Sequence, residues 1–295
     1  MSTRNTYYCF LLLLLVLPAC KNENTDKNSL ADNEVVETPV NENKAAPMYV
    51  AALSGMNMRA TPDIKGEILK LVQYNDKVEV LEKTGIGLEV EGIQGEWYKV
   101  KDYEKEGYVF SGFLLDFEPP TGTPSVGFEN YLSKYFKESE PKQAYSVKYK
   151  DGTSEKVVTP IPLEKVQVNE EMDWFEIIEK YEGGRTYTEV IGYESSTKKI
   201  FIPNISMREG FLLMKGILPY FLIAEDQCGL ELKKVPFSKK NYTIKIDESC
   251  IFNIEIGKVG NEVTSITISN DDYYYSGLSV IKVNGGLEIS RFYAL

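Results

Sequence analysis

The chain has 295 residues, of which 43% are hydrophobic and 26% are charged, a composition typical of a globular protein. This length exceeds what one hydrophobic core usually organises, so we expect about two domains. The 33 basic and 44 acidic residues give a formal net charge of -11, which excludes long-range attraction to nucleic acid or anionic lipid. Histidine is absent, which also excludes Ser-His-Asp, Cys-His and His-zinc chemistry.

Residues 1–19 have the pattern of a cleavable signal peptide. Residues 7–17 form an almost unbroken apolar run that is too short to span a bilayer permanently. Residues 17–20, LPAC, resemble the lipobox of bacterial lipoproteins, which implies a lipid on Cys20 and a membrane anchor in the cell envelope. Because Lys21 follows the cysteine, the sorting rules of such lipoproteins favour the outer membrane if the host has one. The alternative is a plain secretory signal with an incidental cysteine.

Residues 20–47 are expected to be the lipidated cysteine and a disordered tether. This segment consists mainly of Asn, Glu, Asp, Lys, Thr and Ser, and it is too polar to bury a core of its own. As a flexible coil it would reach roughly 30 Å between its ends, and about 90 Å when fully stretched. The tether would therefore let the folded part leave the membrane surface.

Short strand-like runs bounded by turn residues follow, with the spacing of a small barrel. The predicted strands are 49–53, 57–59, 67–72, 77–82, 97–100 and 107–110. The same region resembles bacterial SH3-like (SH3b) domains through an ordered series of motifs. These are MNMRATP at 56–62, GEIL at 66–69, KVEVL at 77–81, GEWYKV at 95–100, GYVF at 107–110 and GFL at 112–114.

The resemblance places an SH3b domain at residues 48–117. The sequence departs from the family at Ala60-Thr61, at Tyr108, where tryptophan is usual, and at residues 85–95, where we expect an inserted loop. By our count the domain carries 8 basic and 12 acidic residues, so overall charge attraction is excluded as its mode of binding.

Five residues of this domain are candidates for ligand binding. Trp97 and Tyr74 are the aromatic candidates, because a partly exposed ring gives a large contact area at low entropic cost. Packing of either ring in the barrel core is the alternative. Asn57 and Arg59 lie in the strand typical of the family, and Arg59 is able to bind a carboxylate with two hydrogen bonds or to form an internal salt bridge. Tyr108 completes the set.

A turn-rich linker at residues 118–124 leads to a second domain at residues 125–295. Ser125 is predicted to cap a helix whose apolar residues between 128 and 136 have helical spacing. Ser206 and Glu209 have the form of a capping box that begins a second helix. The predicted strands of this domain are 145–149, 156–158, 175–181, 186–193, 199–202, 220–224, 230–235, 242–246, 252–256, 263–269, 278–283 and 287–292.

The whole chain is therefore predicted to be mainly β. A small SH3-like barrel should be followed by a second β-rich domain, an antiparallel twisted sheet or partial barrel with about two helices against it. We recognise no family in this second domain.

Cys228 and Cys250 are candidates for a disulfide. The turn at residues 237–241 is centred midway between them, so the two cysteines would face each other in a simple hairpin. Export would place them in an oxidising compartment. Two buried free thiols are the alternative.

Two acidic and aromatic segments have a polar turn as their main interpretation. Residues 271–275, DDYYY, combine carboxylates and rings that would suit calcium or a sugar, but a calcium loop needs more oxygen ligands at set spacing. Residues 170–174, EEMDW, are predicted to be a polar turn before a strand. We predict no catalytic residue, no metal site and no cofactor.

The leading functional hypothesis is a lipid-anchored binding module whose SH3b domain contacts peptidoglycan peptide or an envelope protein. The second is an envelope hydrolase, because SH3b domains often accompany such enzymes. A two-carboxylate glycosidase would not need histidine, but we recognise no such pair and expect no enzyme. The third is a structural or assembly lipoprotein whose second domain docks a partner, which an exposed apolar patch would favour.

Overall fold

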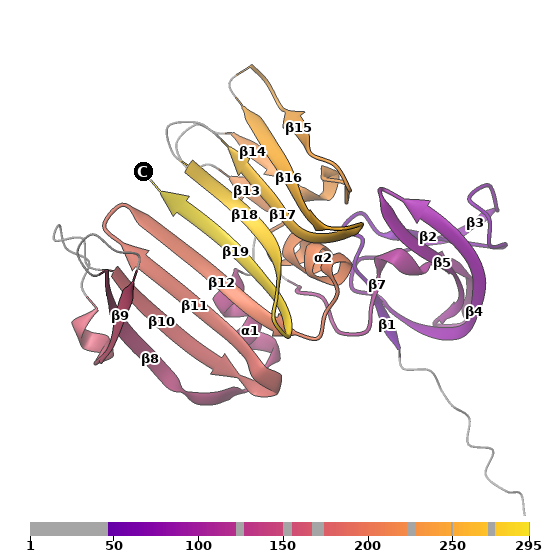
Figure 1. The fold of residues 1–295 in the computed structure, drawn as a ribbon. Helices are drawn as coiled ribbons and strands as arrows, with labels where there is room; N and C mark the ends of the chain where they lie inside the picture. The colour runs from indigo at the N-terminus through magenta and orange to yellow at the C-terminus, as the bar shows by residue number, and fades with distance from the viewer. Residues whose placement is uncertain are drawn as a thin grey trace, which may run out of the picture. The chain divides into compact units, whose positions relative to one another are not determined.

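Alternating apolar residues build a small barrel at the start of the folded chain. A computed structural model describes residues 47–121, 127–149, 155–166, 174–222, 228–248, 250–270 and 275–294. Its first sheet has seven strands in the order β3-β2-β6-β5-β4-β1-β7 (Figure 1). Valines that alternate along these strands, such as Val78, Val100 and Val109, are fully buried inside the barrel. The strands are β1 (Met48–Val50), β2 (Met56–Arg59), β3 (Ile68–Val72), β4 (Lys77–Val90), β5 (Ile93–Asp102), β6 (Lys105–Phe110) and β7 (Leu114–Leu115).

Strands β4 and β5 form one long hairpin, so the expected loop at residues 85–95 is wrong. Val90 pairs with Ile93, and Glu91 and Gly92 form the two-residue turn with φ angles of 51° and 77°. A turn with positive φ at both positions matches the twist of the strands it joins. Register shifts between Val80 and Glu82 and between Lys83 and Gly87 interrupt the alternation of side chains and hide this strand in the sequence.

The second domain is built on one antiparallel sheet of ten strands, in the order β15-β16-β17-β18-β19-β12-β11-β10-β8-β9, and also contains a two-stranded sheet, β13-β14. Each half of the sheet follows a helix in the sequence, and the last strands of the two halves, β12 and β19, pair with each other. The bounds are β8 (Glu138–Tyr149), β9 (Lys156–Ile161), β10 (Trp174–Tyr181), β11 (Arg185–Gly192), β12 (Ser195–Pro203), β15 (Tyr242–Lys245), β16 (Ile251–Val259), β17 (Glu262–Asn270), β18 (Tyr275–Val283) and β19 (Gly286–Ala294). The predicted mainly β fold with two helices is confirmed.

Helices α1 (Phe128–Tyr135) and α2 (Met207–Ile217) pack against this sheet and share its hydrophobic core (Figure 1). The predicted capping box of α2 is present, with Ser206 and Glu209 bonded reciprocally. Helix α1 is preceded by Gly127 as its N-cap. The predicted cap, Ser125, lies outside the described residues.

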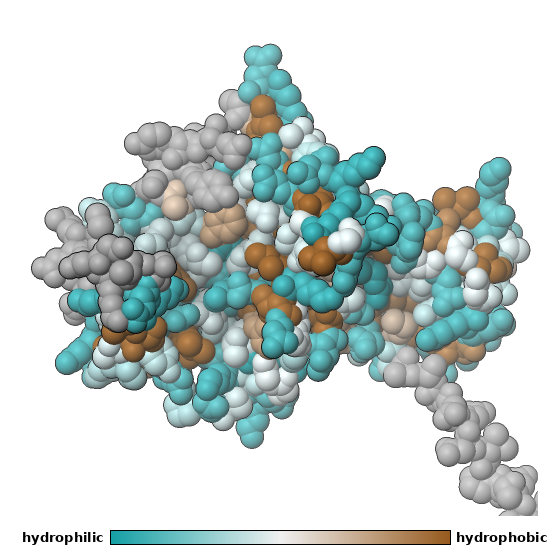
Figure 2. Space-filling view, in the orientation of Figure 1, coloured by the Kyte–Doolittle hydropathy of each residue, from teal (hydrophilic) through white to brown (hydrophobic). Residues whose placement is uncertain are grey.

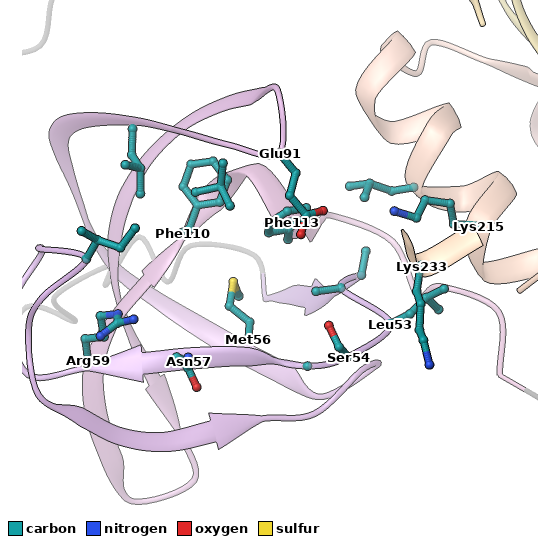
Figure 3. A pocket seen from close by; sticks show the side chains of 17 residues that line it. Leu53, Ser54, Met56, Asn57, Arg59, Glu91, Phe110, Phe113, Lys215 and Lys233 are labelled. Carbon is teal, nitrogen blue, oxygen red and sulfur yellow. The ribbon is translucent and has the colours of Figure 1, made fainter. Parts of the chain in front are cut away.

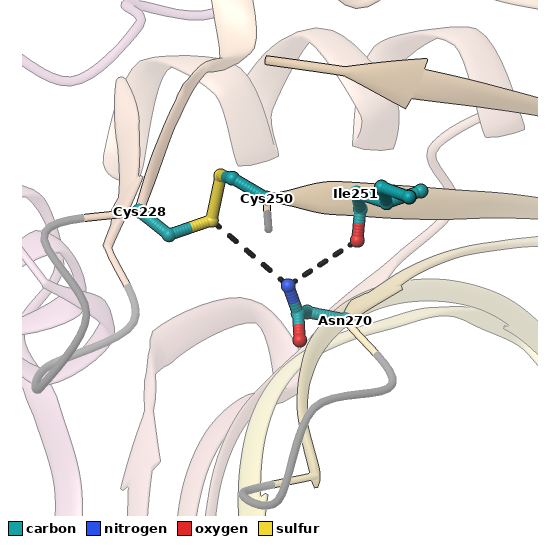
Figure 4. Close-up of a disulfide and its surroundings, with 4 residues drawn as sticks. All are labelled: Cys228, Cys250, Ile251 and Asn270. Atoms are coloured by element: carbon teal, nitrogen blue, oxygen red, sulfur yellow. Dashed lines mark hydrogen bonds between the residues drawn. A yellow bond between two sulfur atoms is a disulfide. The ribbon is translucent and has the colours of Figure 1, made fainter. Parts of the chain in front are cut away.

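A disulfide joins Cys228 to Cys250, with their α-carbons 5.6 Å apart (Figure 4). The hairpin from which we predicted it does not exist, because β14 (Gly229–Glu231) pairs with β13 (Tyr220–Leu222) and β16 pairs with β15. The bond instead links the residue that precedes β14 to the residue that precedes β16. Asn270 donates hydrogen bonds beside it to the Cys228 sulfur, at 3.9 Å, and to the Ile251 carbonyl, at 3.2 Å.

The predicted signal peptide, Cys20 and the predicted tether up to residue 46 lie outside the described residues, as do 271–274 and most of 170–174. No helix in the described part of the chain is long and apolar enough to cross a membrane.

Candidate functional site

A pocket of about 290 Å³ lies where the barrel meets α2 (Figure 3). The chain from Ala51 to Arg59 forms one side of it. Polar and apolar side chains share the lining. The larger apolar side chains from the barrel are Leu53, Met56, Ile64, Leu88, Val90, Phe110 and Phe113, and α2 adds Leu212.

Strand β2 brings two of the predicted site residues to this pocket. Met56 and Met58 are buried and their neighbours Asn57 and Arg59 are not, because side chains alternate between the two faces of a strand. Asn57 and Arg59 both line the pocket. The Arg59 guanidinium donates a hydrogen bond of 2.7 Å to the Gly66 carbonyl, which fixes its position.

The β4-β5 hairpin adds a wall that a shorter hairpin would lack. Leu88 and Val90 line the pocket, and Glu91 lies at the turn. The turn packs against the second domain so closely that a Cβ on Gly92 would lie 1.8 Å from the Phe237 carbonyl oxygen. Glycine is therefore required at this contact.

Helix α2 closes the pocket and joins the two domains. Nη1 of Arg208 lies 3.2 Å from the Ser111 carbonyl oxygen and 3.0 Å from those of Gly112 and Leu114. One turn later, Leu212 is 2% exposed and belongs to the core of the barrel. Arg208, Leu212 and Lys215 share one face of the helix because residues three and four apart are neighbours.

Lys215 brings a buried amino group to the pocket. Lys215 is only 6% exposed, and its Nζ donates a hydrogen bond of 3.0 Å to the Val235 carbonyl. The ammonium also lies 5.2 Å from the centre of the Phe211 ring. Burial lowers the pKa of Lys215 to about 8, and the negative charge of Glu91 opposes this only in part.

The three aromatic candidates lie elsewhere. Trp97 is 4% exposed, so its ring is buried in the barrel and offers no binding surface. Tyr74 lies at the domain junction, where its hydroxyl donates to the Pro120 carbonyl at 2.8 Å and burial raises its pKa. Tyr108 is half-buried on β6, opposite Arg59 and Lys99. None of the three lines the pocket.

The comparisons with known proteins concern the barrel alone. A family model described as bacterial SH3 domain matches residues 54–114. These residues form a bacterial SH3 domain. No curated protein and no solved structure matches the chain significantly. The SH3 domain suggests a binding module. The matched residues 54–114 include three side chains that line the pocket, Asn57, Arg59 and Phe110.

Sequence reasoning missed the contribution of the second domain to this site. Leu212, Lys215 and Lys233 line the pocket although they lie about a hundred residues beyond the SH3 domain. A partial signal existed for the hairpin wall, since Glu-Gly at positions 91–92 lies between Val90 and Ile93 as in a tight turn. The described residues contain no group of three His, Cys, Asp or Glu side chains placed to hold a metal ion.

Proposed function

We propose that this chain is a binding module of the bacterial cell envelope, and that its SH3 domain and helix α2 together hold a peptide of peptidoglycan. The pocket carries the proposal, because it combines residues of the SH3 domain with an apolar lining and a few polar groups, as ligand sites commonly do. An envelope protein offering a similar peptide is the alternative partner.

Anchoring through Cys20 is the second part of the proposal. It rests on the LPAC sequence at residues 17–20 and on the polar segment that follows. Radiolabelled palmitate supplied to cells making the chain should label it, and Cys20→Ala should remove the label. Equal labelling of both forms would contradict the anchor.

Binding rather than catalysis is the third part. The absence of histidine from the sequence removes the usual general base of envelope peptidases. The proposal of a partner docked on the ten-stranded sheet receives less support, because polar side chains break the apolar surface of the described residues into small areas on the face shown in Figure 2.

The test is co-sedimentation of the purified chain with insoluble peptidoglycan. Ile64 is 58% exposed and lines the pocket, whereas Ile86 is 48% exposed on the same domain and does not line it. We expect Ile64→Asp to reduce the sedimented fraction at least fivefold and Ile86→Asp to leave it unchanged. Neither substitution disturbs the core. Equal sedimentation of the two variants would contradict binding in this pocket.

A further inference from the structure

The pocket has a cation at each end, and one of them comes from outside the SH3 domain. Figure 3 shows Arg59 at one end and Lys215 at the other, with Met56 between them. Lys233 also lines the pocket, but it pairs with Glu231 at 2.7 Å and its amino group is directed away from Lys215. The lining therefore contains three cations and one carboxylate, Glu91.

Lys215 has unused capacity to donate hydrogen bonds. An ammonium has three N–H donors, and the described contacts of Lys215 include one acceptor, the Val235 carbonyl. Glu91 acts on it by charge but forms no ion pair with it among the described residues. The lowered pKa agrees with this geometry, since it reports a buried charge that the protein compensates incompletely. A buried cation in this condition favours an anionic group of a ligand.

The rest of the pocket selects what accompanies that anionic group. Met56, Val90 and Phe110 provide apolar contacts in the same pocket as the lysine. A volume of about 290 Å³ is at the lower limit of ligand pockets, so it suits the end of a chain and not a long segment.

We propose that the pocket binds the end of a peptide through its free α-carboxylate, with Lys215 pairing with the carboxylate and the apolar lining receiving a small terminal side chain. This inference rests on the proposed function and specifies its ligand. It also assigns a role to the second domain, because α2 supplies the amino group. The SH3 domain has an excess of acidic residues, so the amino group that attracts the anion would come from another part of the chain.

The experiment measures the affinity of the purified chain for three N-acetylated trialanine peptides by calorimetry. One ends in D-alanine as the free acid, one in L-alanine as the free acid, and one in D-alanine amide. We expect at least one acid to bind at least tenfold more tightly than the amide. The order of the two acids distinguishes a peptidoglycan stem, which contains D-residues, from the end of a protein.

The substitution Lys215→Met should lower the affinity for the acid to that for the amide. The matched control is Lys101→Met, which removes a positive charge from an exposed position of β5 outside the pocket and should leave the ratio unchanged. Equal affinity of the native chain for acids and amide would overturn the inference without reference to any variant. If Ile64→Asp still reduces sedimentation with peptidoglycan and Ile86→Asp does not, the proposed function would stand while this inference falls.

Discussion

Nη1 of Arg208 lies 3.0 Å from the carbonyl oxygen of Leu114, so a side chain of α2 donates a hydrogen bond to the last strand of the SH3 barrel. The same nitrogen is within hydrogen-bond distance of two further carbonyls, and Nη2 pairs with Glu209 at 3.0 Å. With Leu212 packed in the barrel core, this contact makes the two domains depend on each other.

The substitution Arg208→Met should therefore reduce the free energy of unfolding by about 2 kcal/mol, since it removes the guanidinium donor from these partly buried carbonyls. Trp97 in the barrel and Trp174 in the sheet are the two tryptophans of the chain, so single-tryptophan variants report each domain separately. We expect both probes to unfold at one urea concentration when Arg208 is present and at two when it is replaced. Separate transitions in the presence of Arg208 would contradict the coupling.

Gly216 lies at the same junction between the two domains, where α2 comes close to Tyr74. A Cβ at this position would lie 2.5 Å from the Tyr74 hydroxyl oxygen. Glycine to alanine usually stabilises a helix interior by about 1 kcal/mol, but here we expect Gly216→Ala to destabilise by about 1–2 kcal/mol. Tyr74→Phe removes the hydroxyl, so urea unfolding of the double variant should show a smaller loss than the sum of the two. Strict additivity would argue against this contact.

The disulfide should stabilise the second domain. Cys228 and Cys250 are 22 residues apart, and closing such a loop contributes about 3 kcal/mol in the chain-entropy model. We expect the Cys228→Ser, Cys250→Ser variant to lose about this amount in urea unfolding. Mass spectrometry after alkylation without reduction should find neither cysteine labelled; labelling at both positions would refute the bond.

Lys215 makes stability depend on pH in a defined direction. Its pKa is lowered by burial to about 8, whereas in the unfolded chain it returns to 10.5. Between these values the unfolded chain binds more protons, so the free energy of unfolding rises with pH. At pH 7 the full penalty of the buried charge is present, up to about 3 kcal/mol.

The Lys215→Met variant removes this charge and keeps the stem of the side chain. We expect it to be at least as stable as the native chain at pH 7, with the difference shrinking towards pH 9.5. Urea midpoints at pH 7, 8.5 and 9.5 provide the measurement. Buried tyrosines such as Tyr74 have raised pKa values, and their effect on stability near pH 9.5 is common to both forms of the chain, so it cancels in the difference. Parallel pH profiles would contradict a lowered lysine pKa.

Local patterns were sufficient to predict most of the fold. The motifs between residues 56 and 114 predicted the barrel, and Ser206 with Glu209 predicted the start of α2, because these signals depend on neighbouring residues. The Cys228–Cys250 bond was predicted from a hairpin that the chain does not form. Its correct prediction therefore owes nothing to that geometry.

Only the part of the candidate site that lies on strand β2 was predicted from the sequence. Asn57 and Arg59 on β2 line the pocket, but Trp97, chosen for its ring, is buried. The sequence contains no local signal that Lys215 meets the SH3 domain, because that meeting depends on how α2 packs between barrel and sheet. The domain boundaries at 48–117 and 125–295, and the lipid on Cys20, stay predictions.

The most direct measurement of the central claim, a ligand site built by both domains, is methyl NMR of the chain labelled at Ile, Leu and Met during titration with soluble peptidoglycan fragments. The account predicts shifts of the methyl resonances of Ile64, Met56 and Leu212 together, while Ile86 stays unchanged. Leu212 is the decisive resonance, because it is the apolar lining residue that α2 provides. Binding that moves Ile86 or resonances of the ten-stranded sheet and leaves Ile64 and Leu212 in place would contradict it.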